Sequence, residues 1–174
     1  RDLFACFIDR GYSLSKEVGY NAMVTMESWM FLSSYERFRS NILQQHTMRN
    51  LARFPYDGKR TTAMGINFGI AVISSQYTHV THYRGHYCCS RYYELDDDGV
   101  PIEFPPRNER LKTIASDEFK KIPGSPIAYW ASDRIRQAFA DEAPLEDQFY
   151  VKAGISTGKN EVFILQWHEI DHSL

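Results

Sequence analysis

A glycine-rich stretch near the end of the chain, "AGISTGKNEVF" at residues 153–163, is the pattern that most directly suggests chemistry. A phosphate-binding P-loop has a glycine, four spacer residues and then Gly-Lys-Ser/Thr, so that backbone amides surround the phosphates and a hydroxyl binds magnesium. Here three residues separate Gly154 from Gly158, and Lys159 is followed by Asn160, whose amide is a poor replacement for that hydroxyl. Spacing and chemistry both exclude a P-loop.

A second pattern combines basic residues with an aromatic residue in "PYDGKRTTAMGINFGIAVI" at residues 55–73. Lys59 and Arg60 precede a glycine-flanked apolar run that carries Asn67 and Phe68. In α/β sheets the loops at the carboxyl ends of strands form the binding site. There the basic pair would bind phosphates and Phe68 would stack on a planar substrate, although periodicity alone favours a core position for Phe68.

Other catalytic chemistries fit the sequence poorly. Zinc fingers need two well-spaced pairs of ligands, but the candidate ligands crowd into one segment, so we interpret them as polar strand positions and expect no metal site. These candidates are His79, His82, His86, Cys88 and Cys89. Cys6 lies in an apolar helical stripe, which predicts an inert, packed thiol.

Composition sets the class of protein. The 174 residues, 43% hydrophobic and 14% aromatic, suffice for one domain with a packed core, or one domain plus part of another. No apolar run approaches the roughly 18–20 residues of a membrane-spanning helix, and three cysteines favour a reduced, cytoplasmic location. The start "RDLFACFIDRG" lacks an initiator methionine and a signal pattern, so we expect the interior of a longer protein.

The net charge of −2 conceals basic blocks. Residues 34–60 hold six basic residues against two acidic ones, and residues 107–136 hold seven against four. From residue 137 onward two lysines face seven acids. Such blocks allow local contact with a polyanion despite the acidic total, although ordinary solvated helix faces explain the charge equally well.

Periodicity predicts the elements that position these residues. A helical stripe begins at Leu3 and Gly19 would stop it, while Ser33 and Glu36 form a capping box before a second helix. The apolar face of that second helix is formed by Tyr35, Phe38 and Ile42. A third helix is expected from Ser125 as N-cap to Phe139.

Strands are expected between these helices. Residues 20–26 read as a buried strand and residues 66–75 as another, while residues 77–95 alternate as a strand pair that turns near Gly85. Asp98-Gly99 predicts a tight turn. This order indicates half of an α/β sheet that runs into a different module.

Several strings together resemble a known family, the PglX adenine-specific DNA methyltransferases of BREX phage-defence systems. They are "YNAMVTMESWMFLSSYERFRSNIL", "MGINFGIAVI", "EFKKIPGSPIAYWASDRIRQAF" and "GISTGKNEVFILQWHEI". The resemblance covers almost the whole chain and matches a central piece of a much longer enzyme. It implies a Rossmann-like fold that uses S-adenosylmethionine to methylate N6 of adenine in double-stranded DNA.

The resemblance also divides the chain. Residues 1–122 would complete the second half of the catalytic sheet, and residues 123–174 would form a connecting helix and the start of the target-recognition region. The family's catalytic Asn-Pro-Pro-Tyr and its glycine-rich cofactor motif are absent here and are expected before Arg1. We therefore expect no catalytic residue in this chain and no S-adenosylmethionine bound to it.

By the same resemblance, the glycine-rich stretch is similar to the family's Gly-x-x-Thr-Gly-x-Asn loop. Gly154 and Gly158 would let the backbone approach DNA, and Thr157, Lys159 and Asn160 would donate to phosphates. The family often carries an acid at the position of Lys159. Phe68, with Asn67 beside it, would contact the adenine that is flipped out of the duplex.

Two alternatives remain open from the sequence. One is a non-catalytic DNA-binding or protein-docking module, and the other is part of a fused restriction-and-modification enzyme. Other phage-defence proteins are possible partners in the methyltransferase interpretation, and no membrane contact is expected.

Overall fold

The computed structural model describes residues 2–56, 67–98, 100–144, 147 and 149–150. Residues 1–142 form one compact unit, and residues 143–174 form a second. The functional division at residue 122 stays a prediction. Among the described residues, no helix has the length and apolar character required to cross a bilayer.

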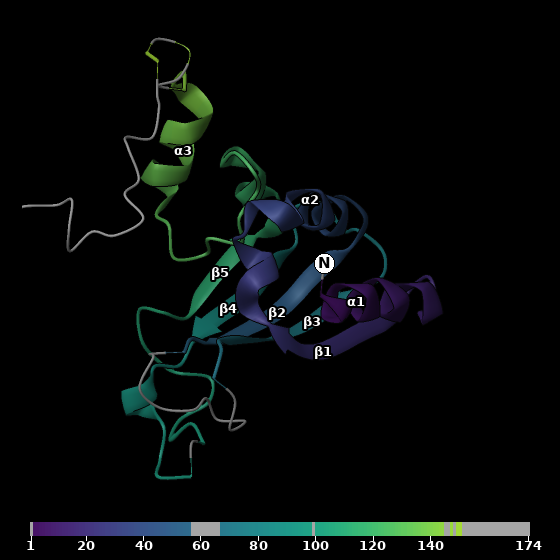
Figure 1. The fold of residues 1–174 in the computed structure, drawn as a ribbon, viewed down its shortest axis with the longest axis vertical. Helices are drawn as coiled ribbons and strands as arrows, with labels where there is room; N and C mark the ends of the chain where they lie inside the picture. Colours follow the sequence, from purple (N-terminus) through teal and green to yellow (C-terminus); the bar gives the residue numbers. More distant parts are fainter. Residues whose placement is uncertain (1, 57–66, 99, 145–146, 148, 151–174) are drawn as a thin grey trace, which may run out of the picture. The chain divides into compact units, whose positions relative to one another are not determined.

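The first unit contains a five-stranded mixed sheet in the order β1-β3-β2-β4-β5 (Figure 1). The strands are β1 Tyr20–Met26, β2 Thr47–Phe54, β3 Ile70–Gln76, β4 Arg84–Cys89 and β5 Lys112–Ala115. β3 is antiparallel to β1 and to β2, whereas β4 is parallel to β2 and β5 is antiparallel to β4. β1, β2 and β4 therefore run in the same direction, and the α/β class predicted from the sequence is confirmed.

Helices cover one face of this sheet. They are α1 Leu3–Leu14, α2 Glu36–Gln45 and the 3₁₀ helix η1 Glu27–Met30. The row Met23, Ile73, Leu51 and Tyr87 crosses four strands on this face. Its last three members are almost fully buried with Ile8 of α1 and Leu43 of α2. The indole of Trp29 anchors η1, because its N–H donates to the hydroxyl of Thr25 at 3.2 Å.

The other face of the sheet is less completely covered. The row that crosses it consists of Val24, Val72, Ala52 and Cys88. Val24 is 50% exposed and Tyr20, on the same strand and face, is 61% exposed. Residues 20–26 therefore form the predicted strand, but it is an edge strand with alternating burial rather than the buried strand that was expected.

The predicted strand pair over residues 77–95, with its turn near Gly85, is wrong. Gly85 lies inside β4, and that strand pairs with β2 and β5. A Cβ at residue 85 would come within 2.5 Å of the Met48 carbonyl oxygen. The glycine is needed for the close approach of two strands, which a sequence pattern cannot distinguish from a turn.

The third helix begins later than predicted. α3 spans Asp133–Asp141, and its N-cap is Ser132, whose hydroxyl accepts from the Ile135 amide at 3.3 Å. Tertiary contacts explain the difference. The Ile127 amide donates to the Met30 carbonyl at 3.0 Å and the Tyr129 hydroxyl donates to the Cys88 carbonyl at 3.0 Å. These bonds hold residues 127–129 in the core in a non-helical conformation.

Two further local predictions are wrong. The Ser33–Glu36 capping box does not form, because residues 33–35 make a 3₁₀ turn and α2 starts at Glu36 without a side-chain cap. Cys6 is exposed on α1 rather than packed. The buried face of α2 is as predicted, since Tyr35 and Ile42 are 5% and 3% exposed and Phe38 packs against the core.

Candidate functional site

The carboxyl ends of β1, β2 and β4 lie at the same end of the sheet, because these three strands run in the same direction. We call this end the carboxyl edge, to distinguish it from the edge strand β1. Glu27, directly after β1, donates its amide to the Gly69 carbonyl at 3.0 Å. Gly69 directly precedes β3, which runs the opposite way, so the start of β3 lies at the carboxyl ends of its neighbours. This is the edge at which open α/β sheets bind their ligands.

An ion pair between Arg53 and Glu27 lies at the carboxyl edge. Arg53 near the end of β2 makes an ion pair with Glu27, and a second contact between them, from Nη2 to Oε1, is 3.4 Å. Burial acts to lower the pKa of Arg53, but the hydrogen bond and charge of Glu27 outweigh it and raise that pKa. A side chain at Gly69 would overlap the Glu27 carboxylate. Glycine at this position therefore leaves room for the pair.

Two aromatic rings enclose the Arg53 guanidinium. Its central carbon lies 4.9 Å from the centre of the Phe31 ring and 5.2 Å from that of Trp130. Both distances are within the range of cation–π attraction. Trp130 is 50% exposed and thus presents part of its indole to solvent. The edge offers a charged group and an accessible aromatic surface side by side.

A cavity of about 230 Å³ adjoins this cluster, and Arg53, Cys89, Arg110 and Trp130 are among its lining residues. Burial raises the pKa of the Cys89 thiol, although the neighbouring arginines oppose the shift. A thiol with a raised pKa is a poor nucleophile. The chemistry available at this cavity is therefore recognition by charge and stacking.

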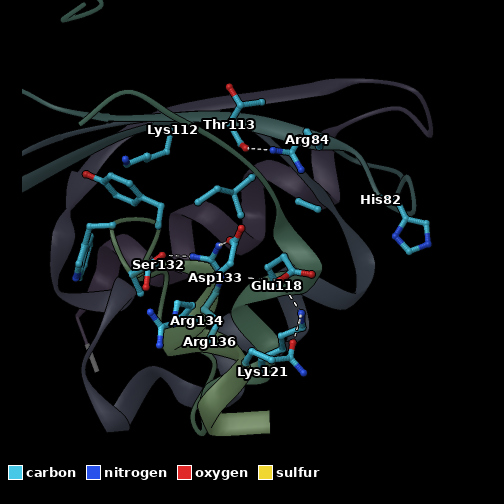
Figure 2. A pocket seen from close by; sticks show the side chains of 16 residues that line it. His82, Arg84, Lys112, Thr113, Glu118, Lys121, Ser132, Asp133, Arg134 and Arg136 are labelled. Carbon is cyan, nitrogen blue, oxygen red and sulfur yellow. Dashed lines mark hydrogen bonds and ion pairs between the residues drawn. The ribbon is translucent and has the colours of Figure 1, made fainter. Parts of the chain in front are cut away.

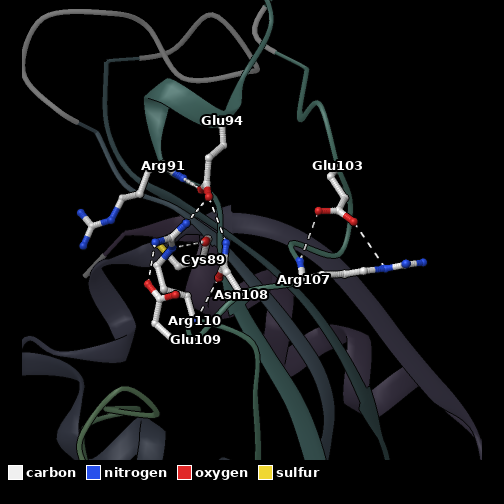
Figure 3. Close-up of polar contacts among 8 residues, drawn as sticks. All are labelled: Cys89, Arg91, Glu94, Glu103, Arg107, Asn108, Glu109 and Arg110. Carbon is white, nitrogen blue, oxygen red and sulfur yellow. Dashed lines mark hydrogen bonds and ion pairs between the residues drawn. The ribbon is translucent and has the colours of Figure 1, made fainter.

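The segment after β4 is tied to this edge by polar contacts (Figure 3). Arg110 donates from Nε to the Cys89 carbonyl at 3.2 Å and forms ion pairs with Glu94 and with Glu109. Asn108 donates to Glu94 at 3.0 Å. Arg110, shortly before β5, is thereby connected to the end of β4 and to Glu94 in the segment between the two strands.

The structure describes only two of the residues predicted to contact DNA. Asn67 is exposed and Phe68 is 39% exposed, directly before Gly69, so Phe68 does not occupy the core position that periodicity favoured. The other candidates lie outside the described residues: Lys59, Arg60, Gly154, Thr157, Gly158, Lys159 and Asn160. Their assignment remains a prediction.

Sequence reasoning missed Glu27 and Arg53, and it did not single out Trp130 from the other tryptophans as a site residue. Glu27 was the easiest to find, because it is the first residue after a strand whose bounds were predicted correctly. Arg53 belongs to a strand that was not predicted at all. The histidines considered as zinc ligands contact different elements: His79 faces the His46 carbonyl and Asp117, whereas His86 faces Thr113.

Comparisons with known proteins give a consistent set of relatives. A family model described as Eco57I restriction-modification methylase matches residues 1–59. The adenine-specific methyltransferase BrxX of Escherichia coli O9:H4 (strain HS) is 37% identical over 172 residues. The adenine-specific methyltransferase PglX of Lacticaseibacillus casei (strain Zhang) is 31% identical over 182 residues. Each alignment covers 97% of this chain and 14% of the relative, so the chain spans about a seventh of their length.

Chains of solved structures are similar as well. One of them, from a type I R-M system, is 15% identical in sequence and gives a TM-score of 0.47 over 76% of this chain and 31% of that chain.

Proposed function

Because this chain is homologous to a segment of the BrxX and PglX adenine-specific methyltransferases, we propose that it is part of an N6-adenine DNA methyltransferase of a phage-defence system. The enzyme would transfer a methyl group from S-adenosylmethionine to adenine in duplex DNA in the cytoplasm, with other defence proteins as partners. Residues 1–122 would complete its catalytic sheet, and residues 123–174 would lead into target recognition.

The observation that carries this proposal is the extent of the alignment. At 37% identity it covers 97% of the chain, so it includes the sheet, its helices and the glycine-rich stretch near the end. The family model adds the description of a restriction-modification methylase for residues 1–59. A shared local motif would not extend through every element in this way.

The surface of the sheet supports the proposal that further polypeptide packs here. β1 is an edge strand that pairs only with β3 among the described strands, and Tyr20 and Val24 project exposed from it. Leu3 and Phe7 of α1 are 73% and 61% exposed. Exposed apolar side chains that gather on one surface often mark a place where other polypeptide packs. A preceding half of the catalytic sheet would cover these apolar groups.

The catalytic groups belong to that other half in this proposal. The only consecutive prolines, Pro105 and Pro106, follow Phe104 and precede Arg107, so they do not form Asn-Pro-Pro-Tyr. This chain would instead supply contacts around the extruded base. Phe68, partly exposed at the carboxyl edge, would stack on the adenine, with Asn67 beside it. The loop candidates Lys59 and Arg60 and the stretch from Gly154 to Asn160 would contact DNA phosphates.

Titration of the purified chain with S-adenosylmethionine in a calorimeter tests where the donor pocket lies. We expect no saturable heat, because the glycine-rich cofactor motif is absent from this sequence. A methyltransferase with a complete catalytic domain serves as the positive control, and circular dichroism verifies that the chain is folded. Saturable binding by the folded chain would overturn the assignment of the donor pocket to other polypeptide.

A further inference from the structure

A large groove lies beside β5, away from the free edge of β1. Its volume is about 970 Å³, and its walls come from β4, β5, the 3₁₀ helix η4 (Ser116–Lys121) and the start of α3 (Figure 2). Figure 2 shows basic side chains from each of these elements around it. The groove lies within the first compact unit. It collects most of the basic block that the sequence carries at residues 107–136.

The charge of the groove is positive because its basic lining residues outnumber the acidic ones, and the acids already have partners. The basic lining residues are Arg84, Lys112, Lys121, Arg134 and Arg136, against the acids Glu118 and Asp133. Glu118 pairs with Lys121 at 2.8 Å, and Asp133 pairs with the buried Arg136. Among the described residues, no carboxylate pairs with Arg84, Lys112 or Arg134. Lys112 and Arg134 are thus without an acidic partner among the described residues, and Arg84 donates one N–H to the Thr113 carbonyl, which leaves its other N–H groups for a ligand.

The spacing of these cations favours a polymer over a single phosphate. Lys112 is opposite Tyr87 in the ladder, and Arg84 is opposite Ala115. Three residues along a strand separate the two positions, which is about 10 Å. Successive phosphates of a nucleic acid strand can meet cations spread over this length, since each strand carries a charge every 3.4 Å or so of its helix axis.

The groove is continuous with the carboxyl edge of the sheet. Trp130 and Lys112 line both the groove and the smaller cavity next to Arg53. A nucleic acid strand lying in the groove would therefore pass the exposed indole of Trp130 and continue towards Phe68 at the carboxyl edge of the sheet. This continuity, with the relationship to adenine-specific methyltransferases, favours DNA over another polyanion.

We propose that this groove binds the sugar-phosphate backbone of duplex DNA, with Arg84, Lys112 and Arg134 contacting phosphates; this inference rests on the proposed function. Contacts of this kind position the duplex without reading its sequence. They release counterions, so the logarithm of the affinity falls with the logarithm of the salt concentration by about 0.9 for each phosphate neutralised.

Fluorescence anisotropy of a labelled DNA duplex, titrated with the 174-residue chain at several salt concentrations, tests this inference. The variant Lys112→Gln/Arg134→Gln should reduce the salt slope by about two, and each lost contact should weaken binding about eightfold near 0.1 M salt. Arg84→Gln should reduce the slope by about one. The matched control is Lys16→Gln, an exposed lysine after α1 at the opposite edge of the sheet, which should leave the slope unchanged.

Three outcomes would overturn the groove assignment. They are no binding of duplex DNA by the chain, a slope in the groove variants equal to that of the Lys16 control, or tighter binding of an RNA duplex of the same length. If the chain binds DNA but the groove variants do not change the slope, only the groove is refuted. The methyltransferase proposal is tested separately, by its donor-binding and methylation measurements.

Discussion

Replacing Arg39 with methionine is expected to lower the free energy of unfolding by about 3–5 kcal/mol. Arg39 of α2 is 1% exposed and donates four hydrogen bonds to backbone carbonyls. Nη1 reaches the carbonyls of Trp29 at 2.9 Å and Leu32 at 2.6 Å, while Nε and Nη2 reach that of Gly124 at 3.1 and 2.7 Å. Methionine preserves much of the volume but donates nothing, so buried carbonyls lose a charged donor.

Urea denaturation followed by circular dichroism measures this effect. Arg37→Ala is the matched control, because Arg37 is exposed on the same helix and its loss should change stability by less than about 0.5 kcal/mol. Arg39→Lys should be nearly as destabilising as the methionine variant, since an ammonium cannot reproduce the planar fork of donors. Equal stability of the Arg39→Met and Arg37→Ala variants would contradict this role for Arg39.

The Tyr87→Ala substitution should lower the free energy of unfolding by a similar amount, about 3–5 kcal/mol. Tyr87 of β4 is fully buried, with its ring 5.3 Å from Phe119 in an edge arrangement and 5.7 Å from Tyr129 in a stacked one. Removing the ring leaves a cavity beneath the floor of the groove and frees Tyr129 to move. We therefore expect the alanine variant to lose DNA affinity at temperatures where it is only partly folded.

Tyr87→Phe separates the ring from its hydroxyl. The hydroxyl lies 3.2 Å from that of Ser116, and burial raises the pKa of Tyr87 to about 12, so the phenol remains neutral at physiological pH. Phenylalanine keeps the ring contacts and loses one neutral hydrogen bond, worth about 1 kcal/mol. Chemical denaturation of both variants gives the comparison. If phenylalanine and alanine destabilise equally, the aromatic packing is not the dominant contribution.

The parts of the fold that the sequence predicted well are those determined by local pattern. The bounds of the strand at residues 20–26 and the buried face of α2 follow from short-range pattern and match the structure, although the strand is at the edge of the sheet and not buried. The strand at residues 47–54 was not predicted, because Arg49 and Arg53 interrupt its apolar pattern. Their side chains are accommodated by aromatic partners, Tyr83 for Arg49 and Trp130 for Arg53. A pattern cannot show such compensation.

The candidate site was harder to predict for the same reason. The sequence predicted a strand after the segment that carries Asn67 and Phe68, but the antiparallel direction of β3, which brings Phe68 to the carboxyl ends of β1 and β2, is a property of the whole sheet. The N-cap of α3 is Ser132 and not the predicted Ser125, because the hydroxyl of Tyr129 donates to a backbone carbonyl of β4 and holds this segment outside the helix. The same displacement places Trp130 over Arg53. Long-range contacts therefore decided the features of the site that the sequence did not reveal.

A segment exchange in the Escherichia coli relative tests the central claim most directly. The matching segment of that protein is replaced by this chain, and N6-methyladenine in cellular DNA is measured by mass spectrometry. The same protein without the segment gives the baseline, and an exchange with the Lacticaseibacillus casei segment controls for tolerance of a foreign sequence. We predict methylation well above the baseline. Baseline methylation from a chimera that is as soluble and abundant as its parent, while the control exchange is active, would contradict the account.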